Sequence, residues 1–216
     1  MGFDALDEID RWIADREEEF VEDVRSLIRI PSVSVTGDKS FVYGKGCKDA
    51  ADRMIEIAEA YGFKAQDCGG RCVKVSYGEY AEGKPDVEIW GHLDVVPEGD
   101  GWKYPPYECT RIGDYLIGRG IGDNKGPLMI VLYSMRWLKE HGVSLNYNLS
   151  QLCGLAEETG MEDASWYLSQ YRAPDFAFIS DCRFPLCHGE KGRCTMTFIS
   201  DGVPNDLLEL EAGIVV

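Results

Sequence analysis

This chain of 216 residues contains few basic residues and no long apolar run. Lys and Arg number 22 against 38 Asp and Glu, which gives a formal net charge of −16 at pH 7. Such a charge opposes binding to nucleic acid or an anionic membrane, is compatible with binding cations, and for the most part reflects a solvated acidic surface. No apolar run reaches the roughly 20 residues that span a bilayer, and the acidic N-terminal segment lacks the apolar stretch of a secretory signal. We therefore expect a cytoplasmic protein with neither a nucleic-acid nor a membrane partner.

Cysteine motifs and histidines are also scarce. The eight cysteines are scattered, and the pair formed by Cys68 and Cys72 has no second pair at the spacing that a zinc ribbon needs. Free thiols are the expected state of cysteines in a cytoplasmic chain. Only three histidines occur, namely His92, His141 and His188.

Hydrophobic periodicity predicts strands that alternate with helices. Apolar residues at helical spacing predict helices over 4–30 (bent or broken, ending before Pro31), 47–61, 124–142 and 160–171. Strands are predicted over 72–80 (half-exposed), 86–96 (deeper in the sheet), 114–120, 145–158 and 174–181. This alternation indicates an α/β sheet with helices on both faces. Residues 193–216 differ, because two extended runs, 194–200 and 207–216, flank a Gly/Pro turn with no helix after them. They resemble the start of a second domain.

Acidic and imidazole side chains follow the predicted strands, at the point where each strand ends. In open α/β sheets ligands bind beyond the carboxyl ends of strands, so these side chains are expected to share one edge. They are His92 and Asp94, Asp123 in the turn before a buried helix, the adjacent pair Glu157 and Glu158, and Asp181.

So many carboxylates beside one histidine would repel each other unless cations neutralise them. Divalent metals do so, and mixed histidine and carboxylate ligands suit Zn, Mn or Co. Of Glu157 and Glu158, one can bind metal while the other acts as a general base. Asp94 can hydrogen-bond the ring nitrogen of His92 that does not bind metal. Each signal alone also fits a polar turn, a helix N-cap or a surface pair, and only their joint placement favours a metal site.

Four segments together resemble a metallopeptidase family that includes dipeptidase V, carnosinases, carboxypeptidase G and succinyl-diaminopimelate desuccinylase. They are GHLDVVPEGDGW (91–102), GRGIGDNKGP (118–127), AEETG (156–160) and ISDCRFPLCHGEKG (179–192). The resemblance runs from about Leu27 to the end of the chain and is strongest to the dipeptidase V branch. It implies a three-layer sandwich, with a mixed sheet between helices, over residues 1–192. Residues 193–216 would begin the family's lid and dimerisation domain, so a homodimer is possible.

The resemblance also implies a dinuclear metal centre in the full-length protein, with zinc as the expected metal and manganese or cobalt as alternatives. His92 and Asp181 would bind the first metal, Asp123 would bridge both metals, and Glu158 would bind the second. An aspartate at position 181 is typical of the dipeptidases and aminoacylases of the family.

The catalytic roles implied by the resemblance fall on two further residues. Glu157 would be the general base for a metal-bridging hydroxide that attacks the peptide bond of a small peptide, and Asp94 would orient His92. The alternatives that stay open are an amidohydrolase acting on N-acyl amino acids and a non-catalytic metal-binding fragment.

Two departures from the family pattern stand out. Asn124 replaces an aspartate of many relatives at a position that is not a ligand, so little consequence is expected. The family's downstream histidine ligand of the second metal is absent, and neither His141 (expected to cap a helix C-terminus) nor His188 takes its place. His188 could line the substrate pocket or be an ordinary loop residue. We therefore expect an N-terminal portion of a longer enzyme, with weak or no activity by itself.

Overall fold

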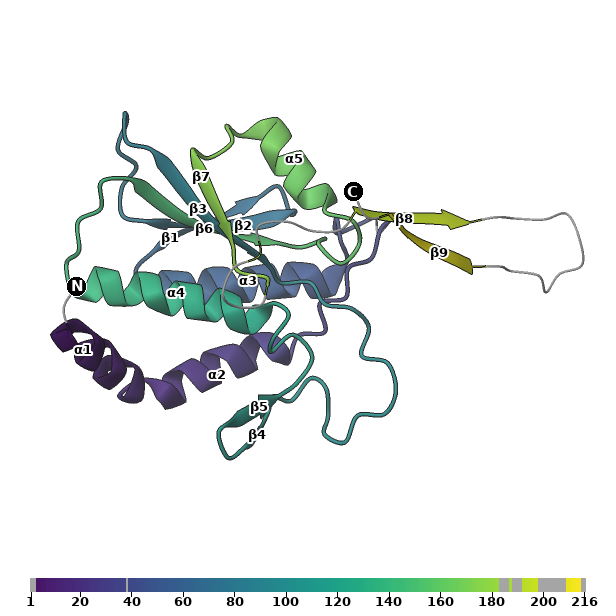
Figure 1. Ribbon diagram of the computed structural model, residues 1–216, viewed down its shortest axis with the longest axis horizontal. Helices are drawn as coiled ribbons and strands as arrows, with labels where there is room; N and C mark the ends of the chain where they lie inside the picture. The colour runs from purple at the N-terminus through teal and green to yellow at the C-terminus, as the bar shows by residue number, and fades with distance from the viewer. Residues whose placement is uncertain (1–2, 38, 183–186, 188–191, 198–208, 215–216) are drawn as a thin grey trace, which may run out of the picture. The chain divides into compact units, whose positions relative to one another are not determined.

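A five-stranded mixed sheet, in the order β1-β2-β6-β3-β7, organises the first 181 residues of the computed structural model (Figure 1). The structure describes residues 3–37, 39–182, 187, 192–197 and 209–214. The helices are α1 (Phe3–Ala14), α2 (Glu17–Ile28), α3 (Lys45–Ala60), α4 (Lys125–Glu140) and α5 (Glu162–Gln170). The sheet strands are β1 (Lys64–Cys68), β2 (Cys72–Tyr77), β3 (Asp86–His92), β6 (Asn148–Gly154) and β7 (Phe176–Ile179), and β4 (Thr110–Ile112) and β5 (Tyr115–Ile117) form a small separate hairpin.

Strand direction brings three carboxyl ends to one edge of the sheet. β3 runs parallel to both β6 and β7, whereas β1 and β2 are antiparallel to their neighbours. The register pairs His92 with Gly154 and Trp90 with Ile179. Whatever follows β3, β6 and β7 therefore emerges at the same edge.

Helices cover both faces of the sheet, as expected from the sequence. α3 packs on β1 and β2, and α4 packs on β3 and β6, while α5 lies on the opposite face against β2 (Figure 1). α2 packs in turn on α3 and α4. The core lies between the sheet and the two helices α3 and α4. In α4, Leu128, Met129 and Leu132 recur at helical spacing and are fully buried. The prediction of an α/β fold with a mixed sheet between helices is confirmed.

The structure adds two strands to those predicted from the sequence. β1 and β4 were not predicted, because their short sequences KAQDC and TRI lack apolar alternation. The prediction that β2 is half-exposed is confirmed, because Val73 and Val75 are fully buried while Lys74 and Ser76 are partly exposed. The predicted long N-terminal helix is broken between α1 and α2, as expected.

The second unit, residues 182–216, contains β8 (Gly192–Thr197) and β9 (Glu209–Ile214). These strands pair antiparallel and correspond to the two extended runs of the sequence. The domain boundary between residues 192 and 193 stays a prediction. Within the described ranges, every helix is too short or too polar to cross a bilayer.

Glu140, at the end of α4, ties the N-terminal helices to the rest of the first unit. Its carboxylate accepts hydrogen bonds from Trp12 Nε1 (2.7 Å), Arg16 Nη2 (2.9 Å) and Arg136 Nε (2.7 Å). Burial would raise the pKa of Glu140, but the hydrogen bonds from Trp12 and Arg136 and the charges of both arginines lower it.

Replacing Glu140 with Gln is expected to reduce the free energy of unfolding at pH 7 by up to about 1 kcal/mol, the range of partly exposed ion pairs. Because the pKa of Glu140 is lower in the folded state, this stability is present above the unfolded-state pKa and is lost as the pH falls through the folded-state pKa. The difference between wild type and Glu140→Gln should therefore shrink below about pH 4. Urea denaturation across pH 3–7 measures it. The exposed Glu56→Gln is the matched control, and a difference that does not change with pH would contradict the prediction.

Candidate metal centre

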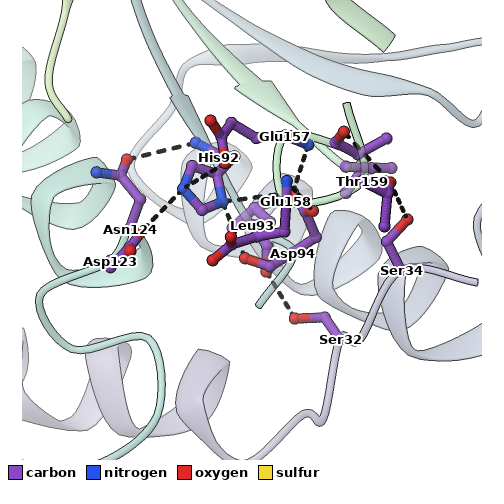
Figure 2. A network of polar contacts seen from close by, with 12 residues as sticks. Ser32, Ser34, His92, Leu93, Asp94, Asp123, Asn124, Glu157, Glu158 and Thr159 are labelled. Atoms are coloured by element: carbon purple, nitrogen blue, oxygen red, sulfur yellow. Dashed lines mark hydrogen bonds and ion pairs between the residues drawn. The ribbon is translucent and has the colours of Figure 1, made fainter. Parts of the chain in front are cut away.

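His92, the last residue of β3, lies at the centre of a polar cluster at the sheet edge (Figure 2). Its side chain is 1% exposed. The imidazole Nδ1–H donates to the backbone carbonyl of Asp94 at 2.9 Å. This bond leaves Nε2 as the nitrogen that faces the open side of the cluster, as a metal-binding histidine requires.

Three carboxylates surround Nε2 of His92. Asp123 Oδ1 lies at 2.9 Å, Asp181 Oδ2 at 3.3 Å and Glu157 Oε2 at 3.9 Å. Burial would lower the pKa of His92, but its hydrogen bond to Asp94 and the negative charges around it raise that pKa to about 10. A lone pair on Nε2 that faces this many carboxylate oxygens is stable only with a cation between them, either a proton or a metal ion.

Two sets of possible ligands share His92. One atom each from His92, Asp123 and Asp181 lies within 4.8 Å of the others, and the same holds for His92, Glu157 and Glu158. Burial raises the pKa of both glutamates, with further contributions from Glu158 on Glu157 and from Asp123 on Glu158. The cluster therefore gathers the histidine and four carboxylates singled out in the sequence, and a mixed set of this kind fits divalent metals such as zinc.

Asp94 contacts both His92 and the backbone of the two glutamates. Its side chain is fully buried. The contact with the imidazole is made by the Asp94 carbonyl at 2.9 Å, with the carboxylate Oδ1 farther away at 3.4 Å. The two carboxylate oxygens accept the backbone N–H groups of Glu157 (3.2 Å) and Glu158 (3.1 Å) (Figure 2). Asp94 thus fixes both the imidazole and the turn that follows β6.

Asn124 is a buried part of the cluster whose contribution the sequence did not suggest. Its Oδ1 accepts the backbone N–H of His92 at 3.3 Å, and its Nδ2 donates to Ser180 O (2.9 Å) and Asp181 Oδ1 (3.0 Å). The peptide bond between Asp123 and Asn124 is cis. Asn124 therefore links the end of β3 to the segment that carries Asp181. The sequence signal for this role is the position of Asn124 beside Asp123, immediately before the buried helix α4.

His141 lies apart from these contacts. His141 follows α4, where its Nδ1–H donates to Trp137 O at 2.7 Å and its ring stacks on Trp137. This agrees with the expected position at a helix C-terminus. His188, the candidate substrate-binding residue, lies outside the described residues.

Gly91 gives Asn124 room to reach the backbone of His92. A Cβ at this position would lie 2.3 Å from Asn124 Oδ1 and 2.8 Å from Leu128 Cδ2. Gly91→Ala is therefore expected to lower the free energy of unfolding by about 1–3 kcal/mol through overpacking. Urea denaturation measures the loss. Gly122→Ala is the control, because nothing lies within 4 Å of a Cβ there, and similar losses in both variants would argue against the crowding.

Comparisons of the sequence and the structure with known proteins all point to one peptidase family. The family model for peptidase family M20/M25/M40 matches residues 89–197, which include the whole cluster. A Staphylococcus aureus (strain USA300) protein named "Putative dipeptidase" is 30% identical over 192 residues, which cover 88% of this chain and 40% of the relative. The chain thus spans about 40% of the length of the curated relatives it matches.

Solved structures share the fold. Human carnosine dipeptidase 1 superimposes with a TM-score of 0.68 at 22% identity, covering 88% of this chain and 43% of that chain. An M20 family metallo-carboxypeptidase, Sso-CP2 from Sulfolobus solfataricus, does so with a TM-score of 0.60 at 27% identity, covering 75% and 37%. With the family match over half of its residues and a histidine–carboxylate cluster inside the matched segment, this chain belongs to peptidase family M20/M25/M40.

Proposed function

We propose that the complete protein hydrolyses dipeptides with the help of two divalent metal ions, and that this chain supplies most of the metal centre. One observation carries the proposal: Nε2 of the buried His92 is aimed at the carboxylates of Asp123, Asp181 and Glu157. The relatives named above as dipeptidases support the substrate class. Zinc suits the ligand set best, with manganese or cobalt as alternatives. The cytoplasmic location and the homodimer stay predictions.

The proposed ligands follow from the grouping of side chains. His92 and Asp181 would hold the first metal, Glu158 the second, and Asp123 would lie between the two. Metal ions in such a centre would polarise the peptide carbonyl and make a shared water molecule acidic enough to act as hydroxide. Asp94 would keep Nε2 of His92 available as a ligand, through the bond from Nδ1–H to its own carbonyl.

Glu157 is the proposed general base. Its side chain is 38% exposed, so water can reach it, and Oε2 lies 3.9 Å from Nε2 of His92. Burial and the charge of Glu158 raise its pKa, with His92 acting in the opposite direction. A carboxylate at this place can accept and return a proton. Glu157 would take a proton from the attacking water and pass it to the leaving amine.

Metal binding by the isolated chain tests the centre. After loading with Zn or Mn and removal of excess metal, elemental analysis should find about one or two ions per chain, because the first ligand set is complete here. Asp123→Ala should abolish retention, and Asp114→Ala, in the exposed β4–β5 turn, should not. Equal metal content in all three proteins, or none in the wild type, would contradict the proposed centre.

Glu157→Gln tests the catalytic step. The assay uses a longer protein that also contains the family's downstream histidine ligand of the second metal. Turnover of a dipeptide should fall by about 10²–10⁴-fold, the usual contribution of general acid–base catalysis, with metal content unchanged. Glu162→Gln, a change of the same kind at an exposed position of α5, is the control. Retained turnover in Glu157→Gln would remove Glu157 from the mechanism.

A further inference from the structure

A second buried carboxylate, that of Asp163 in the first turn of α5, contacts the turn that carries Glu157 and Glu158. The residue is 3% exposed. Its Oδ2 accepts the backbone N–H groups of Leu155 (2.6 Å) and Ala156 (2.9 Å), and its Oδ1 accepts the N–H of Ala164 in α5 (2.8 Å). Asp163 therefore joins the start of α5 to the end of β6.

Two carboxylates together hold four consecutive amides of this turn. Asp163 accepts from residues 155 and 156, and Asp94 accepts from residues 157 and 158. With the backbone fixed at every residue from 155 to 158, the side chains of the two glutamates leave the turn in set directions. The convergence of Glu157 and Glu158 on His92 depends on those directions.

The burial of Asp163 is costly, which argues against an incidental contact. Carboxylates are seldom fully buried unless they are paired, and among the described residues Asp163 forms no ion pair with a basic side chain. Burial raises the pKa of Asp163 although three amides lower it. Gly154 makes the approach possible, because a Cβ at that position would lie 2.5 Å from Asp163 Oδ2.

An acidic residue in the first turn of a helix is commonly explained by the helix dipole. Glu162 fits that explanation, because it lies at the surface and pairs with Arg71. Asp163 does not, because only one of its oxygens serves α5 while the other accepts two amides of the turn after β6. It also lines the same cavity as His92 and Glu157.

We propose that Asp163 is a positioning residue of the metal centre, whose carboxylate fixes the backbone after β6 so that Glu157 and Glu158 face His92. The proposal rests on the proposed function, since its consequence is measured at the metal site. Asp163 belongs to neither of the two sets of possible ligands, so its effect on the metal would be indirect.

Metal affinity is the first measurement. Isothermal titration of the metal-free chain with Zn should show binding that is about 10–100-fold weaker in Asp163→Ala, the usual effect of losing a residue that orients ligands. Asp163→Asn keeps one carbonyl acceptor and should fall between wild type and Asp163→Ala. Equal affinities in wild type and Asp163→Ala would overturn the proposal.

Glu88→Gln is the matched control for general loosening of α5. Glu88 is also buried, and it holds α5 to the sheet through Tyr167 OH (2.8 Å) and accepts from Lys74 Nζ (2.7 Å). The substitution should lower the stability of the chain while leaving Zn affinity within about 2-fold of wild type, because no ligand is held by this network. A loss of affinity as large as that of Asp163→Ala would show that any loosening of α5 has the same effect, and would overturn the specific role.

Amide hydrogen exchange separates this proposal from the proposed function. In the metal-free protein, peptides covering residues 152–158 should exchange faster in Asp163→Ala and Asp163→Asn, while α3 exchanges as in wild type. If wild type binds no Zn, the proposed function fails, and the exchange rates still decide whether Asp163 holds the turn. Unchanged exchange over 152–158 would overturn the proposal whatever the metal result.

Discussion

The geometry of the candidate metal centre depends above all on the hydrogen bonds of Asp94. Its carbonyl fixes the tautomer and orientation of His92, and its carboxylate accepts the amides of Glu157 and Glu158. A single buried residue thus joins two neighbouring parallel strands at their carboxyl ends. The register that pairs His92 with Gly154 sets the distance over which Asp94 can do so. A slip of β6 against β3 would separate the glutamates from the imidazole.

Charge neutralisation in this region relies on the backbone rather than on basic side chains. Asp94 and Asp163 are both buried, and the described residues show no ion pair from a lysine or arginine to either. Main-chain N–H groups stabilise these carboxylates instead, as amides do where anions bind at helix N-termini and backbone nests. The exposed edge of the cluster differs, because there Asp123 and Asp181 converge on His92 and only a cation offsets their repulsion.

Much of the fold and the identities of the clustered residues could be read from the sequence. Apolar periodicity located α3, α4, α5, β3 and β6, and the polar residues after the strands pointed to one sheet edge. β1 escaped prediction because it is an edge strand with few apolar residues. The hydrogen bonds of Asn124 and Asp163 could not be predicted for another reason. Their partners include backbone amides and carbonyls, which every residue has and which leave no signature in the sequence. Asp163 also resembles any acidic residue in the first turn of a helix.

The parallel arrangement of β3, β6 and β7 has a consequence for how the centre forms during folding. The candidate ligands are spread along the chain from His92 to Asp181. Neither of the two ligand sets is therefore local in sequence. Parallel pairings of this kind close long loops and form slowly compared with local hairpins and helices. Asp181 reaches His92 only once β7, which precedes it, has paired with β3. A metal ion bound by His92 and Asp181 would therefore stabilise only chains in which this long-range pairing is complete. Raising the metal concentration would then shift the folding equilibrium toward the fully paired sheet.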